Sequence, residues 1–62
     1  MLVLEMIDHV NGKKWEFFKH EDGLYSVKYY EFFKSAGWRY VYTEERYSAD
    51  AVEEVYDVVL PA

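Results

Sequence analysis

Three glycine-containing turn sequences divide the first 43 residues into four strand-length segments. The turns are Asn11-Gly12, Glu21-Asp22-Gly23 and Lys34-Ser35-Ala36-Gly37. The segments between them are rich in aromatic and β-branched residues, and the first alternates apolar and polar side chains, as β-strands do. Turns this short join antiparallel strands into hairpins. The sequence therefore predicts a four-stranded antiparallel meander.

The second turn allows two registers. A two-residue loop would set Phe17 opposite Lys28, whereas a three-residue loop sets Phe17 opposite Val27 and Glu16 opposite Lys28. The three-residue loop matches apolar with apolar side chains and places opposite charges across from each other. We therefore predict the three-residue loop.

The other two turns predict registers in the same way. An Asn-Gly dipeptide favours a two-residue type I′ turn, which would pair Met6 with Phe17. A four-residue loop at the third turn would pair Glu31 with Tyr40. A loop one residue shorter would flip the last strand and exchange Tyr40 for Arg39 on the same face. The sequence leaves this last register open.

After Thr43 the apolar pattern changes to the period of a helix. Ser48 is a favourable N-cap residue, and the apolar positions fit the i, i+3, i+4 and i+7 spacing of one helix face: Val52, Val55, Tyr56 and Val59. We expect Pro61 to stop this helix. The predicted fold is an α+β domain over residues 1–62, with one C-terminal helix packed on one face of the meander.

The tetrapeptide EFFK occurs twice, at residues 16–19 and 31–34. Adjacent residues of a strand point to opposite faces of the sheet. Phe17 and Phe33 should therefore face the helix, while Phe18 and Phe32 face the other way. One helix cannot cover both faces, so we expect one aromatic face without cover.

The uncovered face is the candidate binding site. It is expected to combine aromatic side chains with basic ones: Phe18, Tyr30, Phe32, Lys14, Lys28 and Arg39. An exposed apolar patch usually marks an interaction surface. The main alternative is an ordinary half-solvated sheet face, partly covered by the stems of long basic side chains. The hypothesis is a small interaction module that forms a homodimer or binds another protein through this face.

A second hypothesis uses the same face for single-stranded nucleic acid. Aromatic rings stack on bases, and Lys14, Lys28 and Arg39 would contact phosphates. The charge distribution leaves this open, because residues 1–43 hold six acidic and six basic residues. Residues 44–62 hold six acids and one arginine, so the whole net charge of −5 lies in the C-terminal third. We interpret the acidic helix face as a solubilising surface.

Enzyme activity, a cofactor and a metal are not expected. The chain has no cysteine, and its two histidines, His9 and His20, would lie roughly 20 Å apart along the first hairpin. Ser26, Ser35 and Ser48 have no predicted histidine partner, and no Gly-rich phosphate loop is present. The sequence also shows no signal-peptide pattern and no apolar run long enough to span a membrane, so we expect a cytoplasmic protein.

Overall fold

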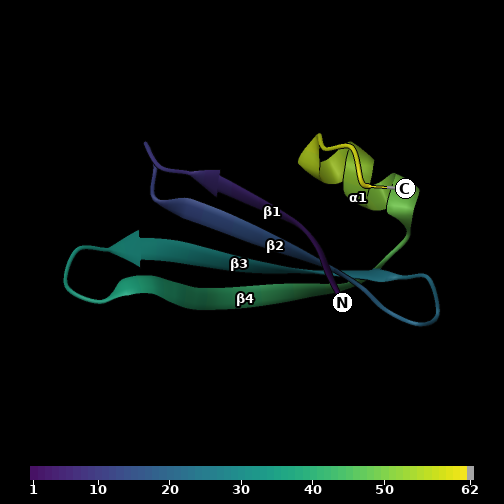
Figure 1. The fold of residues 1–62 in the computed structure, drawn as a ribbon, viewed down its shortest axis with the longest axis horizontal. Helices are drawn as coiled ribbons and strands as arrows, with labels where there is room; N and C mark the ends of the chain where they lie inside the picture. The colour runs from purple at the N-terminus through teal and green to yellow at the C-terminus, as the bar shows by residue number, and fades with distance from the viewer. Residues whose placement is uncertain (62) are drawn as a thin grey trace.

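The fold is a single sheet with one helix at its end. The structure, a computed structural model, describes residues 1–61. Strands β1 (Leu2–Asp8), β2 (Lys13–Lys19), β3 (Tyr25–Phe33) and β4 (Gly37–Tyr47) form an antiparallel sheet in the order β1-β2-β3-β4, and helix α1 (Ala49–Tyr56) follows (Figure 1). The α+β meander with a C-terminal helix is thereby confirmed. The molecule measures 38 × 19 × 16 Å, and α1 lies at one end of its long axis (Figure 1).

The hydrophobic core lies where α1 packs on the sheet. Phe17, Tyr25, Val27 and Val52 form a buried cluster, and Val52 is the buried residue of α1. The Phe17 ring meets Tyr56 edge-on, with 5.4 Å between the ring centroids. An eight-residue helix is only about 12 Å long. It therefore covers one end of the sheet and leaves the other end uncovered.

Helix α1 begins as predicted and ends earlier than predicted. The Ser48 hydroxyl accepts a hydrogen bond from the Ala51 amide at 3.2 Å, which caps the helix. The helix ends at Tyr56, because Asp57 adopts a left-handed conformation with φ of 54°. The prediction that Pro61 stops the helix is wrong.

The early end of α1 changes which valines reach the core. Val55 and Val59, predicted on the apolar helix face, are 60% and 86% exposed. The chain reverses after α1, so that Val58 and Leu60 pack against the core in their place. The Leu60 amide donates to the Glu53 carboxylate at 2.8 Å and fixes this reversal.

The first hairpin differs from its predicted register by two residues. Met6 pairs with Trp15 rather than Phe17, and residues 9–12 form a longer loop. The Asp8 side chain causes the difference, because its carboxylate accepts hydrogen bonds from the backbone amides of Val10 and Asn11 at 3.1 Å each. A shift of two residues leaves Leu4 and Met6 on their predicted face. A bulge between Leu2 and Leu4 changes the start of β1, where Leu2 pairs with Phe18 and Val3, predicted on the other face, packs against the core.

The second hairpin has the predicted register. Phe17 pairs with Val27, and Glu16 pairs with Lys28. The loop holds three residues, since the His20 amide donates to the Leu24 carbonyl at 2.8 Å. Matching apolar with apolar residues and opposite charges across the strands therefore predicted the register of this hairpin correctly.

The last strand combines both registers that the sequence left open. Next to the turn the shorter loop applies, so that Phe32 pairs with Trp38 and Glu31 with Arg39. The predicted pairing of Glu31 with Tyr40 is wrong. A bulge between the pairs Tyr30–Tyr40 and Tyr29–Tyr42 then adds one residue to β4, and the register of the longer loop holds as far as the pair Val27–Glu44. A second shift beyond it pairs Tyr25 with Tyr47.

Candidate interaction surface

The sheet face opposite α1 carries a cluster of aromatic and charged side chains, which we name the aromatic face. Phe17 packs on α1, so its strand neighbours Glu16 and Phe18 point away from the helix. The strand registers place the following residues on this face: Lys14, Glu16, Phe18, Lys28, Tyr30, Phe32, Trp38 and Tyr40.

Aromatic pairs across β3 and β4 form the centre of the aromatic face. The Tyr30 and Tyr40 rings lie 5.9 Å apart and the Phe32 and Trp38 rings 5.3 Å apart, both in edge-to-face arrangements. Such pairs stabilise neighbouring strands beyond the area they bury. The outer rings remain open to solvent, because Phe32 is 49% and Tyr40 57% exposed.

The charge of Lys14 is already engaged within the aromatic face. Its ammonium group lies 4.6 Å from the centre of the Tyr30 ring and 5.2 Å from the centre of the Trp38 ring. The Glu16 carboxylate lies 4.0 Å from the same ammonium group. The Lys14 side chain is only 15% exposed as a result. A lysine held in this way stiffens the surface, and its ammonium group is poorly accessible to a ligand.

Burial and then the Glu16 carboxylate raise the pKa of Tyr30 to about 12. The Tyr30 hydroxyl therefore stays protonated near neutral pH and serves as a neutral hydrogen-bonding group. Nothing in this environment poises Tyr30 for proton transfer at neutral pH.

The structure brings together five of the six predicted binding residues. Lys14, Phe18, Lys28, Tyr30 and Phe32 share the aromatic face, and the Lys28 ammonium lies 5.0 Å from the centre of the Phe18 ring.

Arg39 does not join the other predicted binding residues. It pairs with Glu31, whose carboxylate accepts a hydrogen bond from Tyr29 on the α1 side of the sheet. The shorter third loop causes this, and it places Trp38 and Tyr40 on the aromatic face in place of Arg39. The sequence predicted these two residues on the aromatic face only in the alternative register, with the shorter third loop.

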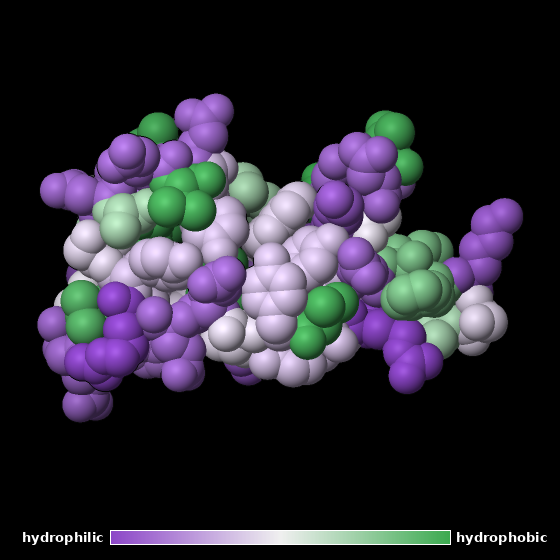
Figure 2. All heavy atoms as spheres, turned by 180° about the vertical axis from the view of Figure 1, so that it is seen from behind, coloured by the Kyte–Doolittle hydropathy of each residue, from purple (hydrophilic) through white to green (hydrophobic). Residues whose placement is uncertain are grey.

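The α1 side of the sheet also exposes aromatic rings beyond the end of the helix. Trp15, Tyr29 and Tyr42 form a continuous row, with ring centroids 5.5 Å and 5.1 Å apart. Tyr29 is buried within this row, whereas Tyr42 is 43% and Phe33 48% exposed. Seen from behind, the molecule shows near-white surface across its middle, with small, strongly hydrophobic patches both beside this region and toward the ends (Figure 2).

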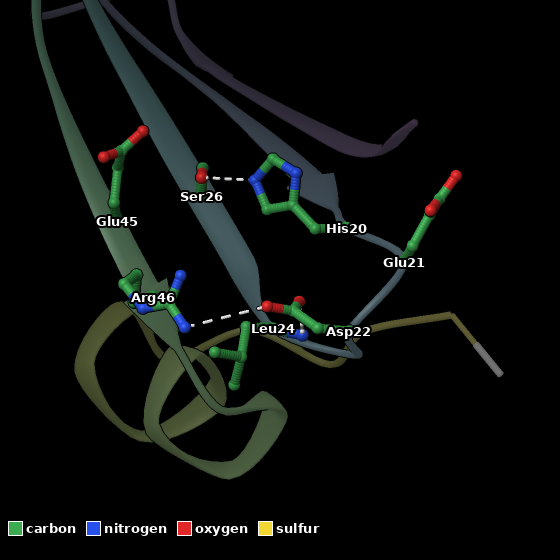
Figure 3. Close-up of a pocket in the computed structure, with 7 residues that line it drawn as sticks. All are labelled: His20, Glu21, Asp22, Leu24, Ser26, Glu45 and Arg46. Carbon is green, nitrogen blue, oxygen red and sulfur yellow. Dashed lines mark hydrogen bonds and ion pairs between the residues drawn. The ribbon is translucent and has the colours of Figure 1, made fainter.

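A pocket of about 520 Å³ lies at the end of the molecule near α1 (Figure 3). His20 points toward Ser26, and its Nε2 atom is hydrogen-bonded to the Ser26 hydroxyl. The prediction that Ser26 lacks a histidine partner is therefore wrong. Arg46 and Asp22 also line this pocket, and the Arg46 guanidinium lies 3.8 Å from the Asp22 carboxylate (Figure 3).

The His20–Ser26 pair lacks the further groups of an acyl-transfer site. Within residues 1–61 no carboxylate is hydrogen-bonded to the His20 ring, as a catalytic triad would require. Ser26 is only 5% exposed, so its hydroxyl is poorly placed to attack a substrate. Among the same residues, no three His, Asp or Glu side chains form a group that could hold a metal ion. The pair links β2 to β3 structurally.

A second, smaller pocket lies at the opposite end of the molecule. It has a volume of about 260 Å³ and is lined by His9, Gly12, Phe32 and Trp38. The Gly12 carbonyl accepts a hydrogen bond from the Phe32 amide at 2.9 Å, which joins the first turn to β3. Since Phe32 and Trp38 belong to the aromatic face, this pocket is its outer end.

Comparisons with known proteins gave no match from which a function could be inferred. No helix within residues 1–61 is long and apolar enough to cross a membrane. No protein-family model, no curated protein and no solved structure matches this chain.

Proposed function

We propose that the protein is a non-enzymatic interaction module that associates through its aromatic face, in the first place with a second copy of itself. The observation that carries the proposal is the row of half-exposed rings on β3 and β4, with Phe32 49% and Tyr40 57% exposed. Aromatic residues in clusters of this kind dominate the binding energy of protein interfaces.

The basic residues favour a protein partner over a nucleic acid. The ammonium group of Lys14 is held by Glu16 and two rings, and Arg39 lies on the other side of the sheet. Lys28 is then the remaining basic group of the aromatic face within residues 1–61. Nucleic-acid binding depends on several phosphate contacts, which one lysine does not supply.

The surface area that a stable dimer interface requires is also available on this molecule. Stable interfaces bury about 800 Å² on each partner, which is roughly 18% of the 4527 Å² surface of this chain. The uncovered end of the sheet, with the turns that border it, is the part of the molecule that can provide this area.

Single-stranded nucleic acid is the second candidate. The position of Lys28 favours it, because its ammonium group lies beside the Phe18 ring on the aromatic face, where a base could stack while its phosphate binds the lysine. Binding of this kind would weaken steeply as the salt concentration rises, whereas apolar association changes little with salt.

The solution mass tests the proposal. Light scattering over a concentration series at low and high salt should give a dimer that is insensitive to salt. Phe32→Ala should weaken the dimer at least tenfold, whereas Arg39→Gln, on the opposite side of the sheet, should leave it unchanged. A protein that stays monomeric at every concentration would contradict self-association.

A matched binding experiment tests the second candidate. Titration with a single-stranded oligonucleotide of mixed sequence should show no saturable binding by the wild-type protein. Salt-sensitive binding that Lys28→Gln weakens would favour the nucleic-acid function instead.

A further inference from the structure

The loop between β1 and β2 presents a single apolar side chain to solvent. Val10 is 94% exposed, more than any other large hydrophobic residue within residues 1–61. Burial of a valine side chain is favourable, and the monomer leaves this side chain in contact with water.

The loop holds Val10 in a defined position. The Asp8 carboxylate accepts hydrogen bonds from the Val10 and Asn11 amides at 3.1 Å and from the Asn11 side-chain amide at 2.8 Å. A loop that is already ordered loses little conformational entropy when it docks. Val10 is therefore a preorganised apolar projection.

A pocket that fits such a projection borders the same loop. His9 and Gly12, which flank Val10 in the sequence, line the pocket of about 260 Å³ together with Phe32 and Trp38. The Phe32 and Trp38 rings meet edge-to-face and give the pocket an apolar wall. A Cβ atom at Gly12 would lie only 3.4 Å from the Phe32 Cβ atom, so glycine allows the loop to approach β3 closely.

The pocket is lined by His9 and Gly12 of the loop that carries Val10, so the projection and the pocket belong to the same end of the molecule, and two copies can offer both to each other. In a two-fold symmetric dimer, a contact from one residue to a pocket is repeated in reverse by the partner. A symmetry axis beside the β1–β2 loop would bring each Val10 over the pocket of the other copy.

The distribution of charge along the chain favours a second copy of the protein as the partner whose side chain fills the pocket. Residues 1–43 carry balanced charges, whereas residues 44–62 carry a net charge of −5. Figure 1 shows the β1–β2 loop and α1 at opposite ends of the long axis of the molecule. Two copies that meet through the loop end keep their acidic helices far apart. A strongly basic partner would instead be drawn to the α1 end.

We propose that in a homodimer the Val10 side chain of each copy fills the pocket formed by His9, Gly12, Phe32 and Trp38 of its partner. This inference rests on the self-association described above and specifies its contact. The aromatic face is incomplete in the monomer, and the partner supplies the side chain that closes its outer end.

Two matched substitutions test the contact. Val10→Ser removes the projection, and Val59→Ser removes an equally exposed valine near the acidic end, where Val59 is 86% exposed. Each dimer loses two buried valines in the first variant, so the dimer dissociation constant measured by sedimentation equilibrium should rise by about 100-fold or more. Val59→Ser should dimerise like the wild type. Circular dichroism melts should show both variants folded, because both positions are exposed.

The outcomes separate this contact from the proposed function. If Val10→Ser dimerises like the wild type while Phe32→Ala does not, the aromatic face is the interface and the Val10 contact is wrong. If the wild-type protein is monomeric at all concentrations, both proposals are wrong. In a mixed dimer of isotope-labelled and unlabelled chains, NMR should show intermolecular contacts between the Val10 methyl groups and the Trp38 ring. Their absence in a populated dimer would overturn the contact.

Discussion

Val52→Ala tests whether one valine docks α1 on the sheet. Val52 is fully buried, in contact with a cluster that includes Phe17 and Val27. Alanine removes two methyl groups, which are worth about 0.8 kcal/mol each, and the cavity adds to the loss because the sheet relaxes only in part. We expect the free energy of unfolding to fall by about 2 kcal/mol.

That loss is large for a chain of 62 residues. Typical stabilities per residue give a total free energy of unfolding of about 3 to 9 kcal/mol for this length. The unfolding entropy scales with length to about 130 cal/mol/K, so a loss of about 2 kcal/mol should lower Tm by about 15 °C. Urea unfolding and a circular dichroism melt measure the two quantities.

Val55→Ala is the matched control on the same helix. Val55 is 60% exposed, so the same chemical change should alter the free energy of unfolding by less than about 0.5 kcal/mol. Equal effects of the two substitutions, or a change below about 0.5 kcal/mol for Val52→Ala, would refute the docking role assigned to Val52.

Three further predictions concern the helix cap, the first turn and alkaline pH. Ser48→Ala removes the acceptor of the Ala51 amide and should cost about 1 kcal/mol in urea unfolding, whereas the same change at the exposed turn residue Ser35 should cost little. Gly12→Ala, at a φ of 64° and close to Phe32, should lower Tm more than Gly23→Ala, which has a φ of 83° and open space around it. The pKa of Tyr30 is raised to about 12, so its stabilising contribution is complete below pH 10 and is lost as the pH rises from 10 to 12. Tyr30→Phe should make that decline in urea stability smaller, and an unchanged decline would contradict the assignment to Tyr30.

Side-chain patterning predicted the faces of the sheet better than it predicted the turns. Phe17 and Val27 are buried together as expected, because burial of one face penalises any slip by a single residue. The first hairpin slipped by two residues, which this penalty does not oppose. The Asp8 carboxylate determined the length of the first loop. Its hydrogen bonds to the amides of Val10 and Asn11 outweighed the preference of Asn11-Gly12 for a two-residue turn.

The candidate site depended on the one strand whose register the sequence left open. A bulge in β4 placed Trp38 and Tyr40 on the aromatic face and Tyr42 on the other, an arrangement that neither uniform register contains. A bulge inserts one residue into one strand of a pair, and the alternating pattern of side chains in the sequence did not mark its position in β4. Arg39 was misplaced for that reason. The five residues on β2 and β3 were placed correctly, because the register of that hairpin was well determined.

The bond between His20 and Ser26 was missed for a different reason. His20 directly follows β2 and Ser26 lies near the start of β3, and the turn between them determines how closely their side chains approach. In the predicted register His20 lies opposite Leu24, and Ser26 lies opposite Phe18, so Ser26 is a diagonal neighbour of His20. Such a neighbour is within reach of a long side chain, but the register alone does not determine whether a bond forms.

The two tryptophans offer the most direct test of the central claim that the aromatic face is the association surface. Trp38 lies on that face, whereas Trp15 lies in the aromatic row on the α1 side of the sheet. The measurement is a dilution series followed by the NMR signals of the two indole N–H groups. The Trp38 signal should shift with protein concentration while the Trp15 signal stays fixed. Two fixed signals, or a shift of Trp15 alone, would contradict the account.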